Sequence, residues 1–73
     1  MRVVGRRIRI HRLVRELTQE QLAEAAGISR SFLSLLEHGA RGVDVVRLLR
    51  IAGVLDVPLT EIVAPPPDQG RTR

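Results

Sequence analysis

The segment from Thr18 to Gly39, TQEQLAEAAGISRSFLSLLEHG, restricts the chain to short helices that meet at a tight turn. It begins with the pattern T-x-x-Q, a capping box in which the two side chains satisfy free backbone N–H groups at a helix start. Gly27 can adopt the left-handed conformation that ends a helix, and Ser29 is a second residue of the type that caps helix starts. These signals predict two helices, over 19–26 and 30–38.

The region before Thr18 is predicted to form a first helix, from about Val4 to Glu16. Apolar residues recur there at positions three and four apart, which is the spacing of one helix face. We expect that face to point into the core, and its residues are Ile10, Leu13, Val14 and Leu17.

Two more helices are predicted after residue 42. Asp44 can cap a fourth helix, and Pro58 can begin a short fifth helix that ends near Val63. The apolar stripe expected in the fourth helix consists of Val45, Leu48, Leu49, Ala52 and Leu55. The sequence thus predicts an all-α, compact five-helix bundle as a single domain over 1–63. The proline-rich, polar segment 64–73 is predicted to be a disordered tail.

The composition indicates an anionic partner. The 73-residue chain has a formal net charge of +4, and six arginines but no acidic residue occur in its first fifteen positions. Every basic residue is arginine, whose planar guanidinium suits phosphate and guanine edges, although a compositional bias of the genome explains the missing lysine equally well. No apolar run is long enough to cross a membrane and there is no cysteine, so we expect a cytoplasmic protein without a membrane partner.

The helix predicted over 30–38 has two different faces on a helical wheel. Leu33 and Leu36 share the side expected in the core. The opposite side lacks acidic residues, which a merely solvated face would usually carry, and comprises Arg30, Ser31, Ser34, Leu35 and His38. Short side chains without negative charge allow a helix to enter the major groove of DNA. The preceding helix would then direct its N-terminal N–H groups toward a phosphate.

The same segment closely resembles the helix-turn-helix of phage-repressor-like (Cro/C1-type, XRE) regulators. Their pattern is roughly L-T-Q-x-x-L-A-x-x-x-G-[IV]-S-x-x-[YFT]-[LI]-S-x-[IL]-E-x-G, and this chain follows it from Leu17 to Gly39. The resemblance implies the lambda-repressor-like fold, a helix-turn-helix unit at about 18–38, and double-stranded DNA as the partner. Glu16 and Asp56 replace glycines that usually follow the first and fourth helices, so both helix ends are expected to be strained.

Four residues are predicted to contact DNA bases: Arg30, Ser31, Ser34 and Leu35. The resemblance implies this position, at base edges or adjacent phosphates, for the first three. Arg30 could bind the O6 and N7 atoms of guanine with both guanidinium branches, and a phosphate contact is the competing possibility. Leu35 cannot form a hydrogen bond, but it can pack on a thymine methyl group or simply contact neighbouring protein.

Five residues are predicted to contact phosphates: Thr18, Gln19, Arg12, His38 and Arg41. The resemblance implies a phosphate contact for Gln19 at the start of the second helix. It also implies an ion pair between Arg12 and Glu37, a structural bridge between the first and third helices that also faces a phosphate. His38 could instead serve only as the end of its helix. The other arginines of the first helix could flank the groove as well.

These features predict a sequence-specific DNA-binding transcriptional regulator, a repressor, that acts as a homodimer on a two-fold symmetric operator. The expected dimer interface lies on the fourth and fifth helices and includes Val46, Val54, Leu59, Ile62 and Val63. The alternative is that these residues complete the core of the monomer. The alternative is an antitoxin-like interaction protein whose main partner is another polypeptide. No enzyme, cofactor, metal or small-molecule ligand is predicted, because the two histidines stand far apart and no phosphate-binding loop or catalytic motif occurs.

Overall fold

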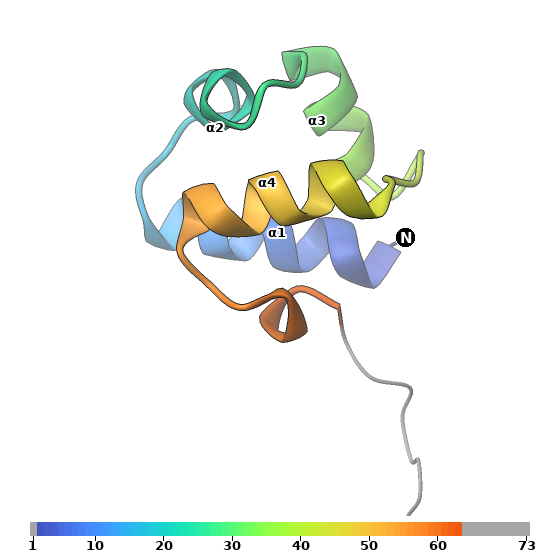
Figure 1. Ribbon diagram of the computed structural model, residues 1–73. Coiled ribbons are helices and arrows are strands. Elements are labelled where there is room, and N and C mark those ends of the chain that lie inside the picture. The colour runs from blue at the N-terminus through green and yellow to red at the C-terminus, as the bar shows by residue number, and fades with distance from the viewer. Residues whose placement is uncertain (1, 64–73) are drawn as a thin grey trace, which may run out of the picture.

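In a computed structural model of the protein, the structure is described for residues 2–63. These residues form four α-helices and one short 3-10 helix (Figure 1). In chain order they are α1 (Arg2–Val14), α2 (Gln19–Ala26), α3 (Arg30–Glu37), α4 (Val45–Leu55) and η1 (Leu59–Glu61). The expected all-α fold is confirmed within this range. The expected count of five helices is wrong, because the segment after Pro58 makes a single 3-10 turn. The tail predicted at 64–73 lies outside the described residues.

α1 and α4 lie side by side and support the other two α-helices. α4 lies alongside α1, although the two helices are far apart in the sequence, and η1 packs near the other side of α4 from α2 (Figure 1). α2 and α3 are joined by a short turn and both contact the α1–α4 pair, α3 through α1 and α2 through α4. The helix-turn-helix unit is therefore supported from beneath by the first and last long helices.

The ends of α2 and the start of α3 form as the capping residues predict. The Thr18 hydroxyl accepts a hydrogen bond from the Gln21 N–H at 3.0 Å, and the Gln21 side chain accepts one from the Thr18 N–H at 2.9 Å. Gly27 ends α2 in the left-handed conformation with φ 72°. Ser29 then accepts a hydrogen bond from the Phe32 N–H at 3.0 Å. Each of these bonds satisfies a group that a helix end leaves free, so local chemistry fixes both helices.

The core is a single cluster of aliphatic side chains contributed by every helix. Its fully buried large members are Ile8, Leu22, Leu33, Leu36, Ile51, Leu55 and Ile62. The predicted stripe of α4 is correct for Leu48, Ala52 and Leu55 and wrong for Val45 and Leu49, which are exposed. Ile51 occupies the core in their place, because α4 turns only the side that carries Leu48 and Leu55 toward α1 and α2.

The rotation of α1 differs from the expectation. Ile10 and Leu13 are half exposed and Val14 is 69% exposed, so three residues of the stripe predicted for the core face outward. Leu17, its fourth member, packs against the core as expected. The buried residues of α1 are Gly5, Ile8 and Arg12. α1 packs with this side toward the core because Gly5 allows a close approach to the last turn of α3. An added Cβ atom at Gly5 would overlap the carbonyl oxygen of Leu36.

The ends of α1 and α4 have the backbone strain expected where another residue replaces the usual glycine. Glu16, after α1, has φ 56°, and Asp56, after α4, has φ 58°. Both values lie in the left-handed region, which costs a residue with a Cβ atom roughly 1 kcal/mol. The start of α4 also differs from expectation, since Asp44 is the N-cap residue but its side chain makes no capping hydrogen bond.

Candidate nucleic-acid interface

The outer face of α3 lies at the surface. Arg30, Ser31 and Leu35 are exposed and Ser34 is half-buried. Leu33 and Leu36 are fully buried behind them, so the helix is held by one side and presents the other. The acidic residue of α3, Glu37, is itself buried, which leaves the exposed side of this helix without negative charge.

A buried ion pair joins α3 to α1. Arg12 Nε donates to Glu37 Oε2 at 2.7 Å and Arg12 Nη2 donates to Glu37 Oε1 at 3.0 Å, a two-branched contact between planar groups. The third guanidinium nitrogen donates to the Leu17 carbonyl oxygen at 2.8 Å. The structure thus brings together the two residues that were expected to pair. Because the pair is satisfied on all sides, it fixes the end of α3 against α1.

Gln19 extends this network to the start of α2. Its Nε2 atom donates to Glu37 Oε1 at 3.1 Å, so its side chain is held while its helix end stays at the surface. A surface hollow opens here, and its lining includes Arg12, Thr18, Gln19, Glu20 and Arg30. Four of the residues predicted to contact DNA therefore meet at one place, between the start of α2 and the start of α3. Glu20 is an acidic residue at its edge.

A second hollow lies at the other end of α3. Its lining includes Arg2, Arg6, Arg9, Glu37 and His38. His38 Nδ1 donates to the Ser34 carbonyl oxygen at 2.8 Å, which leaves Nε2 on the outer side of the ring. The negative charge of Glu37 is paired with Arg12, so the three arginines give this hollow a positive charge. Their spacing along α1 is the sequence signal that places them on one side of the helix.

Arg41 has a position that the sequence did not predict. Its guanidinium carbon lies 4.5 Å from the centre of the Phe32 ring, and that of Arg47 lies 5.2 Å from the same ring. Both distances are typical of cation–π contacts. The sequence signal for this contact is Phe32, the lone aromatic residue of the chain, because its ring is the one aromatic surface on which an arginine can stack.

Arg47 is also linked to the start of α4. Its Nη1 atom donates to Asp44 Oδ1 at 3.2 Å. Partial desolvation raises the pKa of the Asp44 carboxyl, but hydrogen bonds from its own backbone and from Arg47, together with the charge of Arg47, outweigh this and hold the pKa below its usual value. The Asp44 carboxylate thus contacts the Arg47 guanidinium at the start of α4.

The residues proposed for a dimer interface do not share one environment. Ile62 is fully buried in the core, so its assignment to an exposed interface is wrong: the 3-10 turn points it inward. Val54 and Leu59 are partly buried against the same core, and Val63 is 41% exposed. The candidate Val46 is exposed, as are Val45 and Leu49 of the same helix.

The comparisons with known proteins agree with this geometry. The family model described as helix-turn-helix matches residues 8–62, which is most of the chain. This chain belongs to the helix-turn-helix family. Its defining unit is the α2–turn–α3 segment, and the match extends from the second half of α1 through α4 and η1.

Individual relatives agree in sequence and in fold. The immunity repressor protein of Bacillus phage phi105 is 42% identical over 60 residues, which cover 82% of this chain and 42% of the relative. The restriction-modification controller protein C.AhdI of Aeromonas hydrophila superposes with a TM-score of 0.82 at 35% identity, covering 85% of this chain and 94% of that one. SinR of Bacillus subtilis, solved in complex with DNA, superposes with a TM-score of 0.77 at 30% identity, covering 81% and 98%.

The chain spans less than half the length of the first curated relatives it matches. None of the helices in residues 2–63 has the length and apolar character needed to cross a membrane.

Proposed function

We propose that this chain is a sequence-specific double-stranded DNA-binding transcriptional regulator, a repressor that acts by occupying its operator. The outer face of α3 carries the proposal: it is exposed, has no exposed acidic side chain, and is flanked at each end by a hollow lined with arginine. A regulator named as a repressor among the relatives and a structural neighbour bound to DNA support the same function. In this proposal residues 1–63 are one DNA-binding domain in the cytoplasm.

The two hollows would position α3 on the duplex. At the start of α2, the free N–H groups of the first helical turn and the side chain of Gln19 would bind one phosphate. At the end of α3, the arginines of α1 would bind another, and His38 Nε2 would donate to it when the ring carries both protons. Phosphate contacts on both sides set the register of a helix in the groove, while contacts to base edges supply the sequence information.

Arg30, Ser31, Ser34 and Leu35 would contact the bases. Arg30 would bind guanine, the two serines would form hydrogen bonds with base edges, and Leu35 would pack on a thymine methyl group. Arg30 also lines the hollow at the start of α2, where a phosphate contact is the competing role. The two roles differ in what they predict for binding to altered sites.

Binding of Arg30→Ala to single-base variants of a selected site distinguishes these roles. If Arg30 binds a base, the substitution weakens the best site by about 1–3 kcal/mol and removes the preference at one position. Uniform weakening on every sequence would assign Arg30 to phosphate. Arg50→Ala is the matched control, because Arg50 lies on α4 near the end of α2 rather than at either hollow.

Salt dependence tests the phosphate contacts together. Each neutralised phosphate changes the slope of log K against log salt by about 0.9, and the loss of one contacting arginine, as in Arg9→Ala, should reduce the slope by about 1. A nearly flat dependence for the unaltered chain, with tight binding, would contradict the proposed role of both hollows. Equal affinity for random and selected sites would contradict sequence specificity.

The regulator would bind as a homodimer on a two-fold symmetric operator, with half-sites about 34 Å apart. The exposed apolar ridge of α4, Val45, Val46 and Leu49, supports pairing through this helix, in place of the fully buried Ile62. Gly53 continues the ridge and has open space above it. Sedimentation of the chain with and without its site tests this, and Leu49→Glu should favour the monomer. If the chain stays monomeric even on DNA, the proposed homodimer is wrong.

A further inference from the structure

The outward side of α1 combines apolar and cationic residues. Val3, Ile10, Leu13 and Val14 expose between 49% and 69% of their surface there, which is unusual for a row of aliphatic residues on one helix. We call this row and its neighbouring cations the α1 face. Residues 1–15 contain no acidic residue, so the charges that α1 itself places beside the row are all positive, and Glu61 of η1 is an acidic side chain at its edge.

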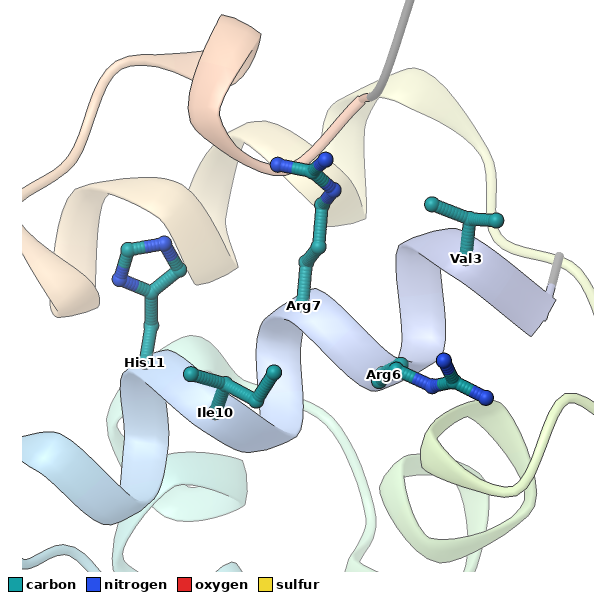
Figure 2. A pocket seen from close by; sticks show the side chains of 5 residues that line it. All are labelled: Val3, Arg6, Arg7, Ile10 and His11. Atoms are coloured by element: carbon teal, nitrogen blue, oxygen red, sulfur yellow. The ribbon is translucent and has the colours of Figure 1, made fainter. Parts of the chain in front are cut away.

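The α1 face is hollowed rather than flat. A depression in it is lined by Val3, Arg6, Arg7, Ile10 and His11 (Figure 2). Arg7 and His11 rise on the side toward η1, Arg6 extends on the other side, and Ile10 lies between them (Figure 2).

Contacts with η1 hold one wall of the depression in place. Arg7 Nη1 donates to the Glu61 backbone oxygen at 3.3 Å, and His11 Nε2 lies 4.0 Å from Glu61 Oε1. On the opposite wall, Arg6 makes no hydrogen bond or ion pair with any other part of 2–63. The depression therefore has an apolar floor, one braced wall and one guanidinium available for a partner.

We propose that the α1 face binds a short amphipathic helix of another protein, one that inserts an aliphatic side chain over Ile10 and places carboxylates beside Arg6 and Arg7. Charge complementarity selects this occupant, because cations border the apolar floor on both sides. A helix whose apolar stripe is flanked by glutamate or aspartate would bury the exposed aliphatic row and pair with the arginines at once.

Two other occupants fit less well. A second copy of this chain would bring Arg6 and Arg7 against the same charges of its partner, which opposes isologous pairing. An anionic bilayer would match the charge, but the flat surface of a membrane cannot reach the floor of a depression walled by the α1–η1 contact. The α1 face shares Arg6 with the hollow at the end of α3, so peptide binding is measured without DNA.

Titration of the isotope-labelled full chain with a synthetic helical peptide tests the proposal in the absence of DNA. The peptide carries leucine at positions three and four apart and glutamate elsewhere, and a second peptide carries lysine in place of every glutamate. We expect backbone chemical shifts to change around Val3, Ile10 and Leu13. The lysine peptide should bind at least about tenfold more weakly, because like charges meet at the arginines.

Substitutions locate the binding surface. Ile10→Ser should weaken the glutamate peptide by about tenfold, since a half-exposed isoleucine loses its apolar contact with the peptide. Val46→Ser is the matched control, because it removes a similar exposed aliphatic residue from α4 and should leave peptide binding unchanged.

Several results would overturn the proposal. They are equal binding of the two peptides, shift changes centred on α4, and no binding of the glutamate peptide. Self-association of the free chain that Ile10→Ser abolishes would assign the face to a second copy instead. Binding of the chain to vesicles of anionic phospholipid, with shift changes at the same residues and none with the peptide, would assign it to a membrane surface. None of these results bears on the DNA site.

Discussion

The α2–α3 unit and α1 are held in place by different kinds of contact. In the unit, hydrogen bonds span three residues of sequence: Thr18 with Gln21, and Ser29 with Phe32. α1 depends on contacts made across more than twenty residues, chiefly Gly5 against Leu36 and Arg12 with Glu37. The contrast shows that a helix-turn-helix can be locally determined while its position against the supporting helices is not.

The largest expected effect comes from breaking the link between the two regions. Arg12→Ala leaves Glu37 buried without its cation, and removal of one partner of a buried pair costs about 3–5 kcal/mol. A chain of this length has a total stability of about 4–11 kcal/mol, so a large part of it would be lost. Urea unfolding followed by circular dichroism measures the loss.

The exposed ion pair of α4 provides the control for this experiment. Arg47 and Asp44 are each half exposed, and surface pairs contribute little to stability. Arg47→Ala should therefore change the unfolding midpoint far less than Arg12→Ala. Equal losses in the two variants would show that the Arg12–Glu37 pair does not anchor α1.

Two isoleucines test the rotation of α1. Ile8 is fully buried and Ile10 is half exposed, although they stand only two residues apart on one helix. Ile8→Ala should cost about 2–5 kcal/mol, because it leaves a cavity in the core. Ile10→Ala should change stability by less than about 0.5 kcal/mol, as for other surface substitutions. The reverse order in thermal unfolding would mean that α1 presents its Ile10 side to the core.

Two glycines test the close approach of α1 to α3. An alanine Cβ at position 5 would overlap the Leu36 carbonyl oxygen, whereas one at Gly53 on α4 would meet nothing within 4 Å. Gly5→Ala should destabilise the chain by about 1–3 kcal/mol through overpacking. Gly53→Ala should stabilise it by about 0.5–1 kcal/mol, because alanine favours the helix. Denaturation midpoints that shift in the same direction for both variants would contradict the asymmetry.

The sequence predicted most of the fold, and the exceptions have a common cause. The bounds of α2 agree with those expected, and α3 ends one residue earlier, because caps and glycines act on their immediate neighbours. α1 begins and ends two residues before the expected positions, and most of its predicted apolar stripe faces outward. Periodicity shows that a helix has an apolar side, but in α1 the packed side is determined by Gly5 and the buried Arg12.

The candidate site could be predicted in part for the same reason. The outer face of α3 follows from its helical wheel, and the structure exposes Arg30, Ser31 and Leu35 there. The hollow at the end of α3 requires the placement of α1, which local signals do not determine. The stacking of Arg41 on Phe32 depends on the loop between α3 and α4 and was likewise not predicted.

A modest loss is expected at the start of α2, where local structure and the proposed phosphate contact meet. Thr18→Ala removes the hydroxyl that accepts the Gln21 N–H and should cost about 1 kcal/mol of stability. Ser29→Ala removes the equivalent bond at the start of α3 and should cost a similar amount. If Thr18 also helps to seat a phosphate, Thr18→Ala should weaken DNA binding more than Ser29→Ala at equal stability. DNA titrations of both variants, far below their unfolding midpoints, compare these losses. Equal binding losses in the two variants would limit Thr18 to its structural role at the start of α2.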